Sequence, residues 1–356
     1  MNDVGWKYNS YEKIPEGLNQ LQLSESDYRL LKKVDWVVTE KIHGANFGIT
    51  TDGVRVDFAK RKELLQLGED FFGYLHKKAQ LEAQAKEIFT LLQAKIANLQ
   101  RVTIYGEIFG GEYPHPDVAV VEGLQAVQTG VYYSPNIEYC AFDIAVSGNF
   151  GSQYLDYDIT LQVLRDVGMM RAEPLFIGKF EQAFNYKIEF ESTIPQILKL
   201  PALHEANKAE GVVIKPVKSI YIETKKGRVR PIIKNKIPEF AEDNCFHEAQ
   251  KWDYQQQFNV ELLISQQVLG FVTLNRLKNV ISKVGRIFGN ENRRERQVKL
   301  LVELLIWDVL DSFNETESEK NFNNFSIENQ QLIMNKLEEA GLKLVEEYYD
   351  SLNSTS

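Results

Sequence analysis

Cysteine and histidine are scarce in this sequence, with two cysteines and five histidines among 356 residues. Cys140 and Cys245 form neither a disulfide framework nor a metal-binding spacing, so we expect a reducing compartment. No apolar run approaches the roughly 20 residues needed to cross a bilayer. The N-terminal segment MNDVGWKYNS has no apolar signal-peptide core and no transit-peptide pattern. The sequence therefore predicts a cytoplasmic protein without a membrane partner.

An excess of positive charge is also missing. The chain has 41 Lys and Arg residues against 50 Asp and Glu residues, a formal net charge of −9 at pH 7. This balance excludes a uniformly basic surface. It does not exclude nucleic-acid binding, because a local basic groove can bind phosphates when charges are screened within about 10 Å at moderate salt. The length is enough for two domains, each with its own core.

The first two thirds of the chain are predicted to mix strands and helices. Short runs rich in Val, Ile and aromatic residues predict strands at 36–40, 46–50, 54–59, 102–107, 137–146, 211–215 and 231–236. One segment, 76–99, has apolar residues at helical spacing. Strands in irregular order with few βαβ alternations indicate an α+β domain of antiparallel sheets flanked by helices.

The rest of the chain is predicted to be helical. Apolar residues follow helical spacing at 260–269, 274–287, 298–310 and 332–349. Polar, turn-rich segments separate these stretches. We place the domain boundary in the segment AEDNCFHEAQ, which gives a first domain at 1–243 and a small all-helical domain at 244–356.

A lysine precedes a glycine in the segment EKIHGAN, residues 40–46. Gly44 allows a tight backbone turn, which lets Lys41 approach a phosphate closely. A nucleophilic amine must be neutral, and neighbouring cations or desolvation favour that form. Taken alone, a surface lysine before a turn is the commoner explanation of this pattern.

Two further strands carry groups suited to a nucleotide. Glu107 follows a predicted strand and precedes a Gly-rich turn, where a carboxylate can accept hydrogen bonds from ribose hydroxyls. Strand alternation puts Phe142 and Asp143 on opposite faces, so that Phe142 can stack on a purine. An ordinary strand-end glutamate and a core phenylalanine are the commoner explanations of these residues taken singly.

Charged residues flank two strands near the end of the first domain. Glu210 opens a buried-looking strand, and Lys215 closes it. Lys234 and Lys236 are two residues apart and so share one strand face. Two cations on one face repel each other unless an anion lies between them. An edge strand with solvated lysines explains this pair equally well.

The order of these motifs is more specific than any one of them. The set resembles the covalent nucleotidyltransferase superfamily, and more narrowly the RNA ligase 2 family, which includes the phage and trypanosome RNA-editing types. The closest local matches are EKIHGANF, the AKR at 59–61, EDFFGY at 69–74, EGVVIKP at 210–216 and VTLNRLKNVISKVG at 272–285. The resemblance covers the chain from Tyr8 to at least Gly285.

The resemblance implies a nucleotidyltransferase (ATP-grasp-like ligase) domain followed by a helical RNA-binding domain. It implies an ATP-dependent RNA ligase that attaches AMP to Lys41 and forms an RNA-adenylate. The implied cofactors are ATP and Mg²⁺, with Mn²⁺ as an alternative ion. The implied partner is RNA with 3′-hydroxyl and 5′-phosphate ends, as nicks in duplex or bridged RNA. We expect a monomer that does not repair ends itself, because the chain leaves no room for a kinase or phosphatase module.

Roles for the other motif residues also follow from the resemblance. Together with Lys41, the implied catalytic residues are His43, Glu210, Lys234 and Lys236, with His43 acting after lysine adenylylation. The residues implied to bind the nucleotide are Glu40, Ile42, Asn46, Arg61, Glu107, Phe142, Asp143, Lys215, Lys234 and Lys236. Glu210 and Asn46 are implied to hold the metal, Asn46 through water.

The predicted helix 274–287 carries a cluster of basic residues. Arg276, Lys283 and Arg286 fall within about one quadrant of it, away from the apolar stripe. We expect this face to bind an RNA backbone, although a solvated helix face is the simpler alternative. DNA ligases and capping enzymes carry a β-rich OB-fold at this place, which the predicted helices do not match. A second alternative is a catalytically silent RNA-binding relative, but the motif residues argue against it, because such a protein needs no nucleophilic lysine.

Overall fold

We describe a computed structural model of the chain, in which residues 8–224, 227–240, 268–285, 291–316, 322 and 327–353 are described. The chain divides into two compact units, Met1–Ile237 and Pro238–Ser356. The sequence places this boundary after residue 243, within a segment that lies outside the described residues. Among the described residues, no helix combines the length and the apolar character needed to span a membrane.

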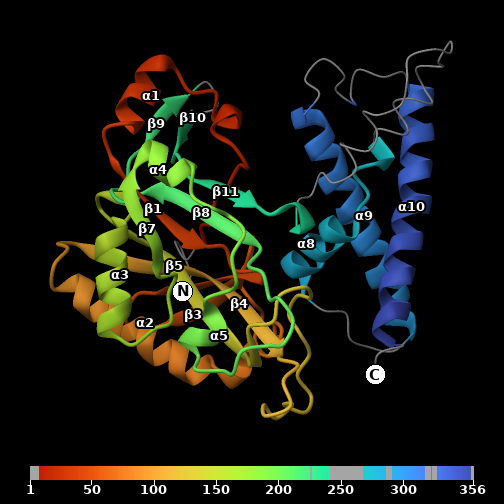
Figure 1. Cartoon of the computed structure of the whole chain (residues 1–356), viewed down its shortest axis with the longest axis horizontal. Coiled ribbons are helices and arrows are strands. Elements are labelled where there is room, and N and C mark those ends of the chain that lie inside the picture. Colours follow the sequence, from red (N-terminus) through yellow and green to blue (C-terminus); the bar gives the residue numbers. More distant parts are fainter. Residues whose placement is uncertain are drawn as a thin grey trace, which may run out of the picture. The chain divides into compact units, whose positions relative to one another are not determined.

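The first unit is built on two antiparallel sheets (Figure 1). The five-stranded sheet has the order β3 (Val56–Lys60), β2 (Ala45–Thr51), β4 (Leu99–Glu112), β5 (Ser134–Gly148) and β6 (Gly151–Tyr154). The four-stranded sheet has the order β11 (Ile233–Lys236), β8 (Gly211–Pro216), β1 (Asp35–Glu40) and β7 (Pro174–Lys179). A small ladder pairs β9 (Ile222–Thr224) with β10 (Gly227–Val229). The predicted antiparallel α+β class is confirmed.

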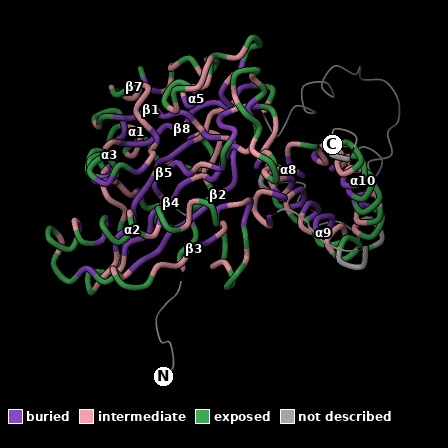
Figure 2. Tube along the Cα trace, turned by 90° about the horizontal axis from the view of Figure 1, so that it is seen from below, coloured by how far each residue is buried: buried purple, intermediate pink, exposed green. Residues whose placement is uncertain are grey.

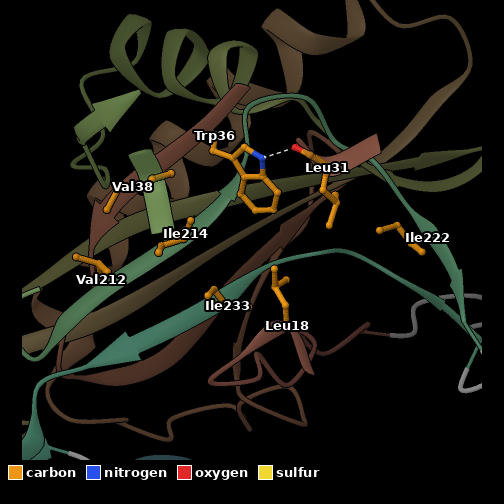
Figure 3. Close-up of a cluster of buried hydrophobic side chains, with 9 residues drawn as sticks. Leu18, Leu31, Trp36, Val38, Val212, Ile214, Ile222 and Ile233 are labelled. Carbon is orange, nitrogen blue, oxygen red and sulfur yellow. Dashed lines mark hydrogen bonds between the residues drawn. The ribbon is translucent and has the colours of Figure 1, made fainter. Parts of the chain in front are cut away.

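One face of the four-stranded sheet carries an apolar core. Trp36 and Val38 of β1 alternate toward it, together with Ile214 of β8 (Figure 3). The indole Nε1 of Trp36 donates a hydrogen bond to the carbonyl of Leu31 at 2.9 Å, which satisfies its one polar atom inside the core. The helical segments against this core are η1 (Leu18–Leu21), α1 (Glu25–Leu31) and α4 (Phe180–Phe184). This packing leaves the alternate residues of β8 and β1 on the opposite face of the sheet.

The helix predicted at 76–99 is present as α2 (Lys78–Gln93), preceded by η2 (Tyr74–His76). Its apolar stripe is buried, as the periodicity predicts. Buried residues follow the central strands, whereas α2 and α3 (Tyr157–Asp166) carry exposed residues (Figure 2). The remaining helical elements are α5 (Ile194–Ile197) and η3 (Pro238–Phe240), of which η3 belongs to the second unit.

The described part of the second unit is helical. Its helices are α8 (Leu274–Val284), α9 (Glu291–Thr316) and α10 (Ile327–Asn353). Thr273 caps α8, because its side chain accepts a hydrogen bond from the backbone N–H of Arg276. Leu277, Leu305 and Leu337, one from each helix, are fully buried. The helix predicted at 260–269 lies almost wholly outside the described residues.

Candidate active site

Lys41 lies directly after β1, at the point where this strand meets β8. Its backbone N–H donates to the carbonyl of Gly211 at 2.9 Å, so the start of β8 fixes the backbone of the nucleophile candidate. Gly44 then turns the chain against β4. A Cβ at Gly44 would lie 2.3 Å from the carbonyl oxygen of Ile108 and 3.0 Å from Glu107. The glycine of the K-x-x-G motif is therefore required by close backbone approach.

The carboxylate of Glu210 joins three candidate residues. It lies 2.6 Å from the Nζ atom of Lys41, 3.2 Å from Nδ1 of His43 and 3.3 Å from the Nζ atom of Lys236. The side chain of Glu210 is only 2% exposed. Burial alone would raise its pKa, but Lys41, His43 and Lys236 together hold the pKa well below its usual range. The structure thus gathers motifs that are up to 195 residues apart around one ionised carboxylate.

Glu107 and Asn46 are paired across β2 and β4. Burial raises the pKa of Glu107 to about 7. The positive charges of Lys41 and Arg61 and a hydrogen bond with Asn46 oppose this rise, whereas the negative charge of Glu210 adds to it. The Oδ1 atom of Asn46 is buried and has no hydrogen-bond partner. A buried acceptor of this kind fits a ligand hydroxyl or a metal-bound water. Both residues were predicted, and Glu107 lies near enough to Lys41 for the charge of the amine to lower its pKa.

Asp143 forms a second buried cluster. Its Oδ1 atom accepts from the Nζ atom of Lys215 at 2.7 Å, and its Oδ2 atom accepts from Arg230 at 3.1 Å and from the Tyr11 hydroxyl at 2.5 Å. Burial would raise the pKa of Asp143, but the two cations and these hydrogen bonds hold it below its usual value. Lys215 also donates to the backbone carbonyl of Phe142 at 2.8 Å. The amine of Lys215 is therefore held by β5 and does not join the Glu210 cluster.

Sequence reasoning missed Tyr11 and Arg230 of this cluster. The ring of Tyr11 lies edge-on to that of Phe142, with centroids 4.9 Å apart. Arg230 lies over the ring of Tyr154, 3.3 Å from its centroid. Phe142, predicted to stack on adenine, thus has an aromatic neighbour from the N-terminal segment. A tyrosine and an arginine outside any motif gave no sequence signal for this contact.

The side chain of Glu40, a residue implied to bind the nucleotide, is held away from the Lys41 amine. Its buried carboxylate accepts from the Ser192 hydroxyl at 2.6 Å, and from the backbone N–H and hydroxyl of Thr193 at 2.8 and 2.7 Å. Burial raises its pKa, and these hydrogen bonds oppose the rise. Strand alternation turns the carboxylate of Glu40 away from the side on which Lys41 meets Glu210, and its role toward the nucleotide stays a prediction.

Lys234 and Lys236 have different partners, although alternation puts them on one face of β11. Lys236 contacts Glu210, whereas the Nζ atom of Lys234 lies 3.4 Å from Glu16 of the N-terminal segment. Ile42, the remaining residue of the lysine motif predicted to bind nucleotide, is buried. Within the described residues, Lys236 is the lysine of this pair that contacts Glu210 directly.

Arg276, part of the basic face predicted on α8, is buried in the structure. This side chain is 3% exposed and contacts Asp308 of α9 at 3.0 Å and the Ser312 hydroxyl at 2.6 Å. Lys283 also contacts Asp308, at 2.6 Å, and is 28% exposed. Periodicity placed these cations together but gave no sign of an acidic residue on the facing helix. Arg286, the third predicted residue, lies outside the described residues.

Comparison with known proteins agrees with the motif order. The RNA ligase family model matches residues 34–236, and the T4 RNA ligase 2 C-terminal model matches residues 255–341. The mitochondrial RNA-editing ligase 2 of Trypanosoma brucei brucei is 30% identical over 321 residues, which is 78% of this chain and 76% of the relative. The mitochondrial RNA-editing ligase 1 is 29% identical over 304 residues, 71% of this chain and 64% of that relative.

Among solved structures, a Naegleria gruberi RNA ligase mutant with ATP and Mn matches with a TM-score of 0.42 and 14% identity, over 65% of this chain and 57% of that chain. The same ligase with PPi matches with a TM-score of 0.41 and 15% identity, over 68% and 58% of the two chains. This chain spans less than two thirds of the length of these structures and of RNA-editing ligase 1.

The class that the fold and motifs define is that of the ATP-dependent nucleotidyltransferases. Within this class, the chain belongs to the RNA ligase family, and in particular to its RNA ligase 2 branch. It is an ATP-dependent RNA ligase by family. The names of the trypanosome relatives place those proteins in mitochondria, and the cytoplasmic location expected for this chain stays a prediction.

Proposed function

We propose that this chain joins a 3′-hydroxyl to a 5′-phosphate in RNA through a covalent lysyl-AMP. The observation that carries the proposal is the contact of Lys41 with the buried, ionised Glu210 beside His43 and Lys236. The carboxylate holds the lysine amine in one place. When the amine is neutral and attacks, the carboxylate remains paired with its other partners, Lys236 and His43. Fixed geometry of this kind is a main source of catalysis in nucleotidyl transfer.

In the first step the Lys41 nitrogen attacks the α-phosphorus of ATP. A nitrogen–phosphorus bond forms, the bond between the α-phosphorus and the bridging oxygen breaks, and pyrophosphate leaves. The Lys41 ammonium must lose a proton before the attack, which nearby cations favour, whereas the Glu210 carboxylate holds the amine in place at 2.6 Å. Lys236 lies against the same carboxylate, where a cation can offset charge that develops on the phosphates.

The second and third steps use the RNA. The terminal 5′-phosphate oxygen attacks the phosphorus of lysyl-AMP, which forms a pyrophosphate-linked RNA-adenylate and returns Lys41. The 3′-hydroxyl oxygen then attacks the 5′-phosphate and AMP leaves, so that one phosphodiester is formed for each ATP used. We assign His43 to these later steps, as the family resemblance implies, and its imidazole contacts Glu210 two residues after the nucleophile.

The residues present fit a nucleotide and a hydrated cation. The unpartnered Oδ1 atom of Asn46 and the neighbouring Glu107 provide acceptors for ribose hydroxyls or metal-bound water. Glu210 and Asn46 would hold Mg²⁺ with few direct protein contacts, as Mg²⁺ usually keeps several waters. The ion would neutralise phosphate charge. Phe142 would pack on adenine, while Ile42, Arg61, Asp143, Lys215 and Lys234 complete the proposed nucleotide site.

The test is incubation of the full chain with α-labelled ATP or GTP and Mg²⁺, followed by a denaturing gel. Label from ATP alone, lost in Lys41→Ala, is the expected result. Label from GTP would indicate a capping-type nucleotidyltransferase, and no label from either would indicate a catalytically silent RNA-binding relative. Sealing of matched nicked RNA and nicked DNA substrates then separates an RNA ligase from a DNA ligase.

We further propose that residues 244–356 bind nicked duplex RNA and that the enzyme acts as a monomer. With Arg276 buried against Asp308, any phosphate contacts must come from other residues of this part of the chain. Duplex RNA is met largely through its backbone and 2′-hydroxyls. A chain ending at Asp243 should still accept AMP at Lys41 but fail to seal pre-adenylylated nicked RNA. Sealing by the shortened chain at the full rate would refute the assignment.

A further inference from the structure

Both flanks of Lys41 are held by side chains that belong to none of the sequence motifs. On one side, Glu40 accepts hydrogen bonds from Ser192 and Thr193, described above. On the other side, the backbone N–H of His43 donates to the Tyr133 hydroxyl at 2.9 Å. Tyr133 is 1% exposed, and its ring packs edge-on to Phe109. The position of each flank thus depends on a segment distant in sequence.

Asn207 connects these two segments. Its backbone carbonyl accepts from the N–H of Ser192 at 2.9 Å. Its side-chain Oδ1 atom accepts from the N–H of Tyr132 at 2.8 Å, and its Nδ2 atom donates to the carbonyl of Tyr132 at 2.6 Å. Its own N–H donates to Glu191 at 2.8 Å. Each polar atom of this buried asparagine therefore has at least one partner, which fixes its orientation.

We infer that Asn207, Tyr133 and Thr193 are positioning residues that hold Lys41 and His43 for their separate steps of the reaction. Asn207 holds the Ser192–Thr193 segment and the Tyr132–Tyr133 segment in one arrangement, and these segments hold Glu40 and His43. The inference rests on the proposed function. It adds that the two segments serve different steps. The segment Ser192–Thr193, here called the Thr193 arm, positions the end of β1 and hence Lys41. The segment Tyr132–Tyr133, here called the Tyr133 arm, positions His43.

The physical reason is that each arm ends in a hydroxyl that is the hydrogen-bond partner of a buried group. When that hydroxyl is removed, the buried group loses a partner. Without the Tyr133 hydroxyl, the N–H of His43 has no acceptor there, and the backbone can turn toward another one. The imidazole would then leave its 3.2 Å contact with Glu210. Without the Thr193 hydroxyl, the Glu40 carboxylate loses one of its hydrogen bonds, directly before Lys41. Small displacements of reacting groups cost large factors in rate.

The first experiment compares Tyr133→Phe with Tyr113→Phe in the full chain. Tyr113 is a buried tyrosine whose hydroxyl is likewise bonded to the backbone, although it donates to the carbonyl of Pro201, whereas that of Tyr133 accepts from an N–H. Lysyl-AMP formation and sealing of pre-adenylylated nicked RNA are measured separately, with thermal melting of each variant. We expect Tyr133→Phe to slow sealing about tenfold while lysyl-AMP forms at nearly the wild-type rate, and Tyr113→Phe to change neither step.

The second experiment tests the other arm with Thr193→Val, which removes the hydroxyl, and Thr193→Ser, which restores it. We expect Thr193→Val to slow lysyl-AMP formation more than sealing, and Thr193→Ser to recover the rate. Asn207→Ala should slow both steps. Equal slowing of both steps by Tyr133→Phe and Thr193→Val, or no slowing by either, overturns the inference. A wild-type chain that forms no lysyl-AMP instead overturns the proposed function.

Discussion

Two buried carboxylates of the first unit, Asp143 and Glu210, are each surrounded by cations, and the clusters differ in their access to solvent. The cations on Asp143, Lys215 and Arg230, are 7% and 6% exposed. Of those on Glu210, Lys236 is 5% exposed but Lys41 is 20% exposed. The Asp143 cluster is closed, whereas the Glu210 cluster opens through one amine. Similar ion pairs can thus secure packing in one place and hold a nucleophile in another.

The largest effect that the comparison predicts is the loss of the lysyl adduct in Lys41→Ala. Among the residues that the structure describes, the other lysine in contact with Glu210 is Lys236, which is almost fully buried and so cannot replace Lys41. Lys41→Arg is the control, because it keeps a cation on Glu210 but should form no adduct. Both variants are incubated with α-labelled ATP and resolved on a denaturing gel. Label on the alanine variant would identify another nucleophile and break the distinction between the two clusters.

For the free energy of unfolding, we expect the Asp143 cluster to matter more than the Glu210 cluster. Asp143→Asn leaves Lys215 and Arg230 buried beside a neutral amide, and we expect it to lower the free energy of unfolding by about 3–5 kcal/mol. Glu210→Gln is equally isosteric, but the Lys41 amine can be hydrated, so its loss should be smaller. Urea denaturation of both variants at one pH measures the difference. A larger loss in Glu210→Gln would show that the Glu210 cluster is mainly structural.

The sequence predicts the Glu210 cluster better than the Asp143 cluster, and the reason is local. Lys41, Glu210 and Lys236 each lie beside a strand with a clear apolar run, in motifs that have a known order. Tyr11 and Arg230 lie outside such runs, and they meet Asp143 from 132 and 87 residues away. Alternation shows which face a side chain takes but not which partner it meets. Arg276 was misread for the same reason, since Asp308 lies on another helix.

Elements with strong apolar patterns were predicted, whereas the strands β6 and β7 were not. The apolar stripe of α2 and the strands β1, β2, β4, β5 and β8 stand out by composition. The strand β6 has the sequence GSQY, and β7 has the sequence PLFIGK. Neither carries a run of β-branched residues. These strands are fixed by pairing with β5 and β1, a tertiary effect that local propensity does not contain.

The two lysines of β11 sharpen the comparison further. Lys236 contacts Glu210 directly, and we expect Lys236→Ala to slow lysyl-AMP formation by about 10²-fold, as for loss of one charge-stabilising donor. Lys234 pairs instead with Glu16, so Lys234→Ala should slow it less. Neither variant should lose as much unfolding free energy as Asp143→Asn. Single-turnover labelling and urea denaturation test both statements, and equal rates for the wild type and both variants would refute the phosphate role.

The smallest effect concerns pH. Burial raises the pKa of Glu107 to about 7 in the absence of nucleotide. A carboxyl group whose pKa is raised by folding binds more protons in the folded state, so its contribution lowers stability as pH rises from its ordinary value of 4.5 to about 7. Ligand binding should change in the other direction. Ribose hydroxyls donate to an ionised carboxylate more strongly than to a neutral acid, so ATP affinity should rise as pH increases through about 7.

Glu107→Gln separates this effect from the titration of ATP itself. The amide keeps the shape of the side chain and an acceptor oxygen but does not titrate. We expect the ATP concentration for half-maximal lysyl-AMP formation to fall by less than about tenfold across this pH range in the wild type, and to show a weaker trend in the variant. Parallel trends in the two proteins would mean that Glu107 does not bind the ribose in its ionised form. In that case the acceptor for the ribose must be sought in its neighbour Asn46, whose Oδ1 atom is buried without a partner.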